Sequence, residues 1–242
     1  MHELIDIQNC FVRHINGYEA INVLLFLISK TREKVLWVVS CSRYAWSFLN
    51  VVTKISDYFS HSVSVDAYSQ QEIRQLILRR QQASGYQVVY RPDANTAKSR
   101  SYKKTLGDPD EEQAFLEDRF FEQLWKQAEG NSTAAMIYWI RSIVDFEESH
   151  FIIEPHKFSG IEYLQEMDSN SLFILAAFVI HDTLCAPELA LVLRISNTSA
   201  QMQVSRLQAQ GLLVSKGDNF SLNDMVFRQV VRLLKSRNIL NT

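Results

Sequence analysis

Residues 1–90 alternate short apolar runs with segments of helical spacing. Residues 35–40 (VLWVVS) form an apolar run that ends in a polar residue, and residues 61–68 (HSVSVDAY) alternate valines with polar side chains, so both are typical of strands. Residues 44–59 place apolar side chains at helical spacing, which predicts a helix. The complete pattern predicts strands over 3–7, 35–40 and 61–68 and helices over 18–29, 44–59 and 69–82. This alternation favours a parallel α/β sheet.

The helix expected over 69–82 has a signal at each end. Ser69-Gln-Gln-Glu72 has the form of a capping box, in which the serine hydroxyl and the glutamate carboxylate each accept a hydrogen bond from a free backbone N–H of the other residue. Gly85 lies just beyond the last turn and is expected to end the helix. These signals predict a helix that begins after Ser69 and stops before Gly85.

The rest of the pattern is mostly helical. Residues 111–146 read as helices, and Pro155 and Gly160 mark a break. Beyond it the pattern predicts helices over 171–181, 187–194, 197–210 and 225–238, and a hairpin that joins 212–214 to 220–222. Three helices, a hairpin and a last helix are the order of a winged helix-turn-helix. The predicted fold class is therefore α/β followed by all-α, with a partial parallel α/β sheet, a helical region and a C-terminal winged helix-turn-helix.

Composition and charge narrow the class of protein. Of the 242 residues, 47% are hydrophobic, which indicates a globular chain, and the net charge of −2 is not that of a general polyanion binder. Three widely spaced cysteines argue for a reducing compartment. No apolar stretch approaches the roughly 20 residues that span a bilayer, and the first residues lack a signal-peptide pattern. We therefore expect a cytoplasmic protein with no membrane span in this chain.

Candidate chemistry begins where the strand expected over 35–40 ends. Cys41 follows it between two serines, but no local pattern supplies the histidine that a cysteine nucleophile needs, so we interpret Cys41 as a small buried side chain. No Cys-x-x-Cys or His-x-His occurs, and we expect no metal site. No Lys-Ser/Thr pair follows the glycines of a P-loop, so the chain taken alone is not expected to hydrolyse a nucleotide well.

Basic residues gather in two segments. Residues 91–107 carry five cations against one acid, which favours a solvated surface loop and, second, a nucleic-acid contact. Residues 189–242 carry seven Lys or Arg against two acids. Here the polar groups that could contact nucleic acid include Asn197, Thr198, Gln203, Arg206 and Lys216. Only two of these five are basic, so binding by this module alone should be weak and salt-sensitive. A winged helix that holds a protein partner is the other interpretation.

The order of the elements, with a few motifs, resembles the later part of an AAA+ or STAND-type P-loop ATPase, the group that includes the origin-recognition-like ATPases. ELIDIQNCF (3–11) is similar to the Walker B strand of that family, which implies a metal-associated acid at Asp6. The strand over 35–40 is similar to the sensor 1 strand. This implies a contact with the attacking water and the γ-phosphate at Ser40, with Ser42 as the second match.

The resemblance extends to the helical lid of the family. GNSTAAMIYWIRS (130–142) resembles the sensor 2 helix, which opens with Gly-Asn or Gly-Asp, and this implies cofactor contacts at Asn131, Thr133 and Arg141. The sequence departs from the family because the sensor 2 arginine falls near Thr133, and Arg141 lies two turns further on. Residues 44–73 contain no arginine that could serve as an arginine finger, so self-stimulated hydrolysis in a ring is disfavoured.

The resemblance divides the chain into three parts. It implies a partial AAA+ α/β core over 1–90, a helical lid with a charged loop over 91–155 and a winged helix domain over 156–242. ATP or ADP with Mg²⁺ is implied as a cofactor only if an upstream P-loop segment or another protein chain completes the site. Two functions are then open: a nucleotide-dependent regulatory switch, or a non-catalytic adaptor whose winged helix binds DNA or a protein partner.

Overall fold

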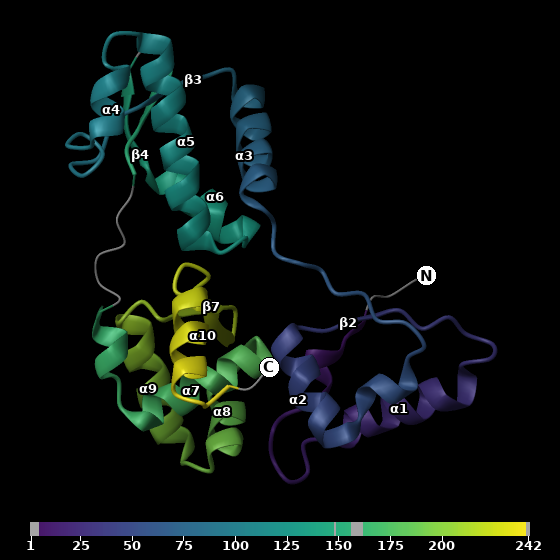
Figure 1. The fold of residues 1–242 in the computed structure, drawn as a ribbon. Coiled ribbons are helices and arrows are strands. Elements are labelled where there is room, and N and C mark those ends of the chain that lie inside the picture. Colours follow the sequence, from purple (N-terminus) through teal and green to yellow (C-terminus); the bar gives the residue numbers. More distant parts are fainter. Residues whose placement is uncertain (1–4, 148, 156–161, 241–242) are drawn as a thin grey trace. The chain divides into compact units, whose positions relative to one another are not determined.

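The chain forms two compact units in the computed structural model, which describes residues 5–147, 149–155 and 162–240 (Figure 1). Residues 5–64 pack with residues 162–240, and we call this the split unit. Residues 65–155 form the inserted unit. The expected division into 1–90, 91–155 and 156–242 therefore differs from the units observed. The fold is mixed α/β, mostly helical, with small sheets that include a parallel pair.

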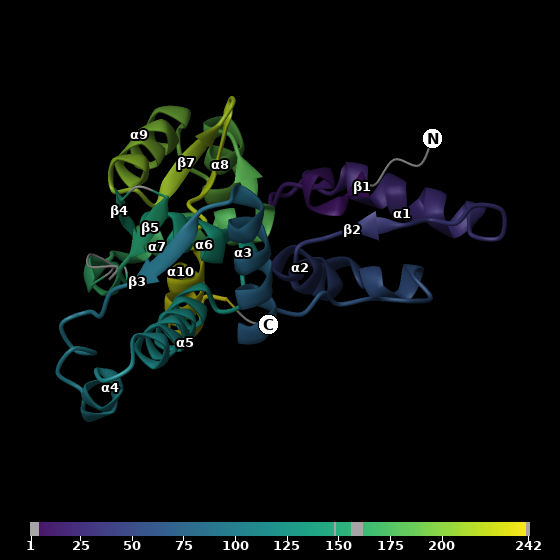
Figure 2. The same ribbon diagram turned by 90° about the horizontal axis from the view of Figure 1, so that it is seen from above.

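The first part of the split unit contains one short parallel strand pair. Its elements are β1 (Ile5–Asp6), the 3-10 helix η1 (Ile7–Cys10), α1 (Glu19–Thr31), β2 (Val39–Ser40), α2 (Arg43–Thr53) and the 3-10 helix η2 (Ile55–Tyr58). β1 pairs with β2 in parallel, as the alternation of strands and helices predicted (Figure 2). The helix expected over 44–59 is divided at Lys54, whose φ of 52° is left-handed.

Of the expected strands, one is shorter than predicted and another is absent. Only the last two residues of 35–40 form a strand, and residues 61–68 form none, so that prediction was wrong. Val63 and Val65 are 88% and 86% exposed, and Leu36 is 89% exposed. A strand needs a neighbour that accepts its backbone hydrogen bonds, and alternating side chains alone do not supply one.

The second part of the split unit follows the expected order of elements. It contains the 3-10 helix η3 (Glu162–Glu166), α7 (Ser169–His181), β6 (Thr183–Leu184), α8 (Ala186–Leu193), α9 (Asn197–Ala209), β7 (Leu213–Lys216), β8 (Asn219–Leu222) and α10 (Phe227–Ser236). The hairpin β7–β8 turns at Gly217, and β6 joins it to make a three-stranded antiparallel sheet in the order β6-β8-β7. The four helices and the hairpin are thus confirmed, and β6 was not predicted.

Both parts of the split unit share one hydrophobic core around α7. Nine of the thirteen residues of α7 form a continuous apolar run, and most of them are buried, so this helix needs partners on all sides. α2 and α10 pack against it, and Phe11 from the segment after η1 stacks near its last residue, His181. Leu49 of α2 and Phe178 of α7 belong to the same buried cluster. Residues 5–64 therefore belong with the C-terminal helices rather than with residues 65–90.

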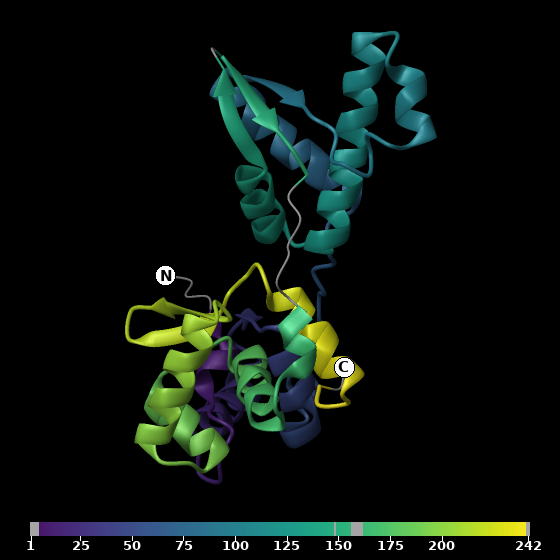
Figure 3. The same cartoon turned by 90° about the vertical axis from the view of Figure 1, so that its left-hand side faces the viewer.

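The inserted unit combines four helices with a three-stranded sheet (Figure 3). Its elements are α3 (Gln70–Ser84), β3 (Gln87–Tyr90), α4 (Arg100–Thr105), α5 (Pro109–Ala128), α6 (Ser132–Arg141), β4 (Ile143–Glu147) and β5 (His150–Ile153). The strand order is β3-β5-β4, with β3 parallel and β4 antiparallel to β5. The capping box at Ser69 and the stop at Gly85 are both confirmed.

Three details of the inserted unit differ from expectation. The helical run expected to residue 146 ends at Arg141, and β4 follows, because residues 143–147 pair with β5. Residues 91–107, expected as a loop, contain the short helix α4. The sheet itself was not predicted, because β3 follows a helix end without a clear alternating pattern. Its Tyr90 packs against Phe120 and Phe121 of α5, which fixes the sheet to the helices.

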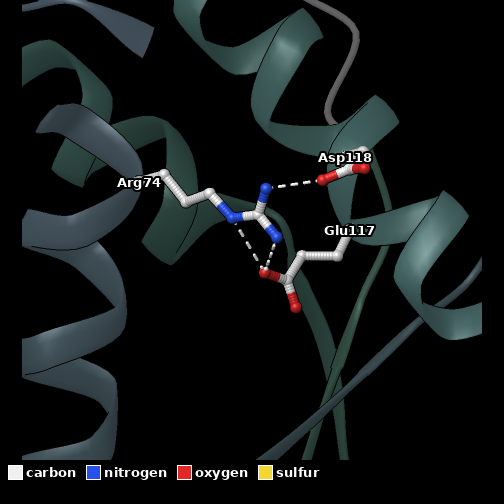
Figure 4. A network of polar contacts seen from close by, with 3 residues as sticks. All are labelled: Arg74, Glu117 and Asp118. Carbon is white, nitrogen blue, oxygen red and sulfur yellow. Dashed lines mark hydrogen bonds and ion pairs between the residues drawn. The ribbon is translucent and has the colours of Figure 1, made fainter. Parts of the chain in front are cut away.

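A charged network joins α3 to α5 in the inserted unit. The Arg74 guanidinium donates to Glu117 Oε1 from Nε at 3.0 Å and from Nη2 at 2.7 Å, and to Asp118 Oδ1 from Nη1 at 2.5 Å (Figure 4). Its plane also lies over the ring of Phe121, 5.7 Å from the centroid. Charge-assisted bonds from one planar fork to two carboxylates fix the crossing of the two helices.

Replacing Arg74 should loosen this crossing. We expect Arg74→Ala to lower the free energy of unfolding by about 1–2 kcal/mol, since the group is partly exposed and its bonds are screened. Arg74→Lys should recover less than half of the loss, because an ammonium cannot reproduce the fork. Urea denaturation measures the change. The control Arg119→Ala removes an exposed pair with Glu122 (2.8 Å) and should cost no more than about 0.5 kcal/mol; an equal loss would contradict the assignment.

Candidate functional site

The parallel pair β1–β2 brings Asp6 and Ser40 together. The two residues are partners in the strand register, and both stand at the carboxyl ends of their strands. The Ser40 hydroxyl donates a hydrogen bond to Asp6 Oδ1. Polar side chains at the carboxyl ends of parallel strands are the usual place for ligand contacts in α/β proteins. The two residues that the family resemblance singled out are thus hydrogen-bonded neighbours in the structure.

The same edge carries the beginning of α2. Ser42 caps this helix by accepting a hydrogen bond from the Ala45 N–H at 3.2 Å, and the Ser42 N–H donates to Gln8 Oε1 at 3.3 Å. The first turn of α2 therefore follows directly on Ser40. Sequence reasoning missed Gln8, whose position two residues after Asp6 was its only signal.

Cys41 is an unreactive neighbour of this site. Burial, together with the nearby Asp6 and Cys10, raises the pKa of its thiol to about 12. The thiol is therefore protonated at neutral pH, and a protonated thiol is a poor nucleophile. This agrees with the interpretation of Cys41 as a small packed side chain.

The expected lid residues belong to the other unit. Asn131 caps α6 by accepting a hydrogen bond from the Ala134 N–H at 2.9 Å. Thr133 is exposed in the first turn of α6, and Arg141 is its exposed last residue. The expected site residues are therefore divided, with Asp6 and Ser40 in the split unit and these three in the inserted unit.

The expected nucleic-acid contacts on α9 do not act as one surface. Asn197 and Thr198 line an open groove of about 670 Å³ with Gln201, Met202 and Ser205. The remaining wall is formed by Ala186 and Pro187 of α8. Most of this lining is uncharged or apolar. The groove therefore offers shape and hydrogen bonds but no cation.

The basic members of that set lie elsewhere. The Arg206 guanidinium donates to the Ser171 hydroxyl and lies 3.5 Å from Asp168 Oδ2, at the start of α7. Lys216 is exposed at the end of β7, and Gln203 Oε1 is buried without a hydrogen-bond partner among the described residues. Arg206 is thus engaged by Asp168 and Ser171. These partners lie 38 and 35 positions earlier in the sequence, so no local pattern could indicate the contact.

Comparisons of the chain with protein families, curated proteins and solved structures gave no match. Within the described ranges, no group of three or more His, Cys, Asp or Glu side chains is arranged to hold a metal ion. None of the helices in those ranges has both the length and the apolar character needed to cross a bilayer. The site geometry is therefore the basis for the proposals below.

Proposed function

We propose that this chain is the sensor, lid and winged-helix portion of an AAA+ or STAND-type P-loop ATPase and acts as a nucleotide-dependent regulatory switch. The observation that carries the proposal is the hydrogen-bonded pair Asp6–Ser40 at the carboxyl ends of two parallel strands. The family resemblance assigns a metal-associated acid and a γ-phosphate sensor to the same two positions.

Exposed apolar side chains before β2 and on α1 and α2 support the proposal that another segment completes the site. Leu36 and Val38 before β2 are 89% and 60% exposed, and Val51 on α2 is 84% exposed. Val23 and Phe26 on α1 are also exposed. Parallel sheets are normally covered on both faces, so a two-stranded piece with this surface fits a sheet that continues into an upstream P-loop segment or another chain.

Each proposed role uses the chemistry of its side chain. Asp6 supplies a carboxylate suited to Mg²⁺, and Ser40 supplies a hydroxyl that can turn from Asp6 to a phosphate oxygen or a water molecule. ATP or ADP with Mg²⁺ would provide the phosphate charge to which these groups respond. Asn131, Thr133 and Arg141 are the candidates on the lid, and Arg141 is the one cation among these three. The module around α9 is the proposed winged helix that transmits the change.

The first test is whether a P-loop completes the site. The coding sequence before Met1, and the proteins that copurify with the chain, are searched for Gly-x-x-x-x-Gly-Lys-Ser/Thr. In the completed protein, Ser40→Ala should lower ATP hydrolysis at least about 10-fold with little change in MgATP affinity, because a positioning hydroxyl acts mainly on the transition state.

Ser56→Ala is the matched control for this test. The Ser56 hydroxyl donates to Asn50 Oδ1 at 2.7 Å on η2, so its loss should cost about 0.5–1 kcal/mol of stability and leave hydrolysis nearly unchanged. The proposal fails if no P-loop is found in the protein or in a copurifying chain, and MgATP does not shift the melting temperature. It also fails if the Ser40 and Ser56 variants hydrolyse ATP equally.

A non-catalytic adaptor is the second candidate. The groove along Asn197, Thr198 and Met202 favours it, because a concave, mostly uncharged surface is suited to a protein side chain. An adaptor would keep its partner whether or not a nucleotide is bound. The nucleotide measurements above therefore separate the two functions.

A further inference from the structure

We infer that α4 of the inserted unit presents a cationic surface that binds the phosphate backbone of a nucleic acid. This α4 surface consists of Lys98, Arg100, Lys103 and Lys104. It lies in a different unit from α9, so it is independent of the function proposed for the winged-helix module. The inference rests on where these side chains stand, how the helix is anchored and which acids lie near it.

Helical geometry places the cations on one side of α4. Arg100, Lys103 and Lys104 are related by three and four positions, which is the spacing of side chains on one helix face. All three are exposed, and so is Lys98 just before the helix. Tyr102 lies between them in sequence and is only 8% exposed. The helix therefore buries its aromatic side and presents its charged side to solvent.

Several hydrogen bonds hold this short helix in place. The Tyr102 hydroxyl donates to Glu112 Oε1 at 2.6 Å, which ties α4 to α5. The Ser99 hydroxyl caps the helix by accepting from the Tyr102 N–H at 3.2 Å. Before the helix, Asp93 Oδ1 accepts from the Thr96 N–H at 2.7 Å, and Thr96 is buried. The helix that carries the cations is thus held in place, and it lies beside α5 (Figure 1).

Among the described residues, the neighbouring acids form no ion pair with this surface. Asp108 is turned to its own helix, where it accepts from the Asp110 and Glu111 N–H groups at 2.9 and 3.4 Å. Glu112 is bound to Tyr102. Of the ion pairs between described residues, none includes a cation of the α4 surface. Like charges three and four positions apart repel one another, so an anion that covers the α4 surface would relieve that repulsion.

A nucleic-acid backbone fits this surface better than a membrane does. A helix that binds a bilayer inserts an exposed apolar face, but the aromatic side of α4 is buried against α5. Phosphates need only cations and hydrogen-bond donors, and exposed Asn95 and Ser101 add such donors beside the lysines. No base-reading group is required, so the contact should be independent of sequence and sensitive to salt.

The test measures binding of the full chain to a 20-base-pair duplex DNA by fluorescence anisotropy over 50–200 mM NaCl. The triple variant Arg100→Gln/Lys103→Gln/Lys104→Gln removes up to three phosphate contacts. Its slope of log affinity against log salt should be smaller by about 2–3, because each contact contributes about 0.9. Its affinity at 50 mM NaCl should fall at least about 10-fold.

A charge-matched control makes the result specific. Arg32→Gln/Arg79→Gln/Arg80→Gln removes the same net charge from exposed positions outside α4 and should retain affinity and slope. Circular dichroism verifies that both variants fold. The inference is overturned if the full chain does not bind the duplex at 50 mM NaCl, or if the two variants lose affinity equally. It is also overturned if the α4 variant instead loses binding only to phosphatidylserine vesicles.

Discussion

Gly130→Ala is expected to lower the free energy of unfolding of the inserted unit by about 3 kcal/mol. Gly130 has a φ of +76°, and a Cβ built there would lie 2.6 Å from the Tyr68 carbonyl oxygen and 2.7 Å from Ala67 Cβ. A left-handed backbone costs alanine about 1–2 kcal/mol, and a clash with backbone adds about 1–3 kcal/mol. The Gly130 carbonyl also accepts a hydrogen bond from the Tyr68 N–H at 3.0 Å, so a shift would weaken a second contact.

Gly85→Ala is the control for this effect. Gly85 has nearly the same φ, +77°, but no atom lies within 4 Å of a Cβ at that position. It should therefore lose only about 1 kcal/mol, which is the backbone term alone. Urea denaturation followed by circular dichroism gives both values. Equal losses at the two glycines would show that the contact between residues 67–68 and Gly130 does not constrain the unit.

Acidification from pH 7 to pH 4.5 is expected to cost the split unit about 2–3 kcal/mol through His181 alone. The side chain is 2% exposed, its ring lies 4.8 Å from that of Phe11, and neither ring nitrogen has a hydrogen-bond partner among the described residues. Burial, together with the nearby Arg13, lowers the pKa of His181 to about 4. The folded protein therefore keeps this imidazole neutral over a range in which the unfolded chain is protonated.

The sign of the effect follows from this difference in proton binding. Below a pH of about 6.5, His181 binds a proton in the unfolded chain but not in the folded protein. The free energy of unfolding therefore falls as the pH falls toward 4. Above pH 6.5, His181 does not contribute to the pH dependence of the free energy of unfolding. His181→Phe should keep stability at pH 7, because it removes two unpaired nitrogens, and it should lose this part of the pH dependence.

Denaturant titrations at pH 7 and 4.5 give the free energy of unfolding of the unaltered chain and of His181→Phe. The carboxylates are the same in both proteins, so their contribution cancels when the two changes with pH are subtracted. His61→Gln changes an exposed histidine and should leave the pH dependence as it is. If His181→Phe loses stability on acidification as steeply as the unaltered chain, then His181 is not the group responsible.

Local signals predicted the parts of the fold that depend on neighbouring residues. The Ser69–Glu72 box and Gly85 fix α3 because their hydrogen bonds join residues three or four positions apart. The helices α7 to α10 and the hairpin β7–β8 were predicted for the same reason, since each has its own apolar spacing, turn or cap. These features need no knowledge of distant contacts.

The parts of the fold that could not be predicted depend on contacts between residues far apart in the sequence. Residues 61–68 alternate like a strand but find no partner, whereas β4 forms where helical spacing continues, because β5 lies beside it. The division into units depends on α7, because residues 5–64 pack in the same hydrophobic core as this helix. No periodicity in either segment indicates that packing.

The candidate site was predictable in part for the same reasons. Asp6 and Ser40 could each be named because each lies in or at the end of a predicted strand, but the hydrogen bond between them was not predicted. The engagement of Arg206 by Asp168 and Ser171 could not be predicted, because it depends on how α9 crosses α7. The α4 surface was visible as a run of cations, but its anchoring through Tyr102 was not.

The split unit also has a consequence for synthesis on the ribosome. Its core needs Leu49 and Phe178, and the whole inserted unit is translated between them. At 5–20 residues per second, residues 5–64 wait roughly 5–20 s for α7 to emerge. During that interval α1 and α2 lack the helix against which they pack, while the inserted unit can already fold. Nascent chains arrested before residue 169 should therefore bind chaperones through the first 64 residues.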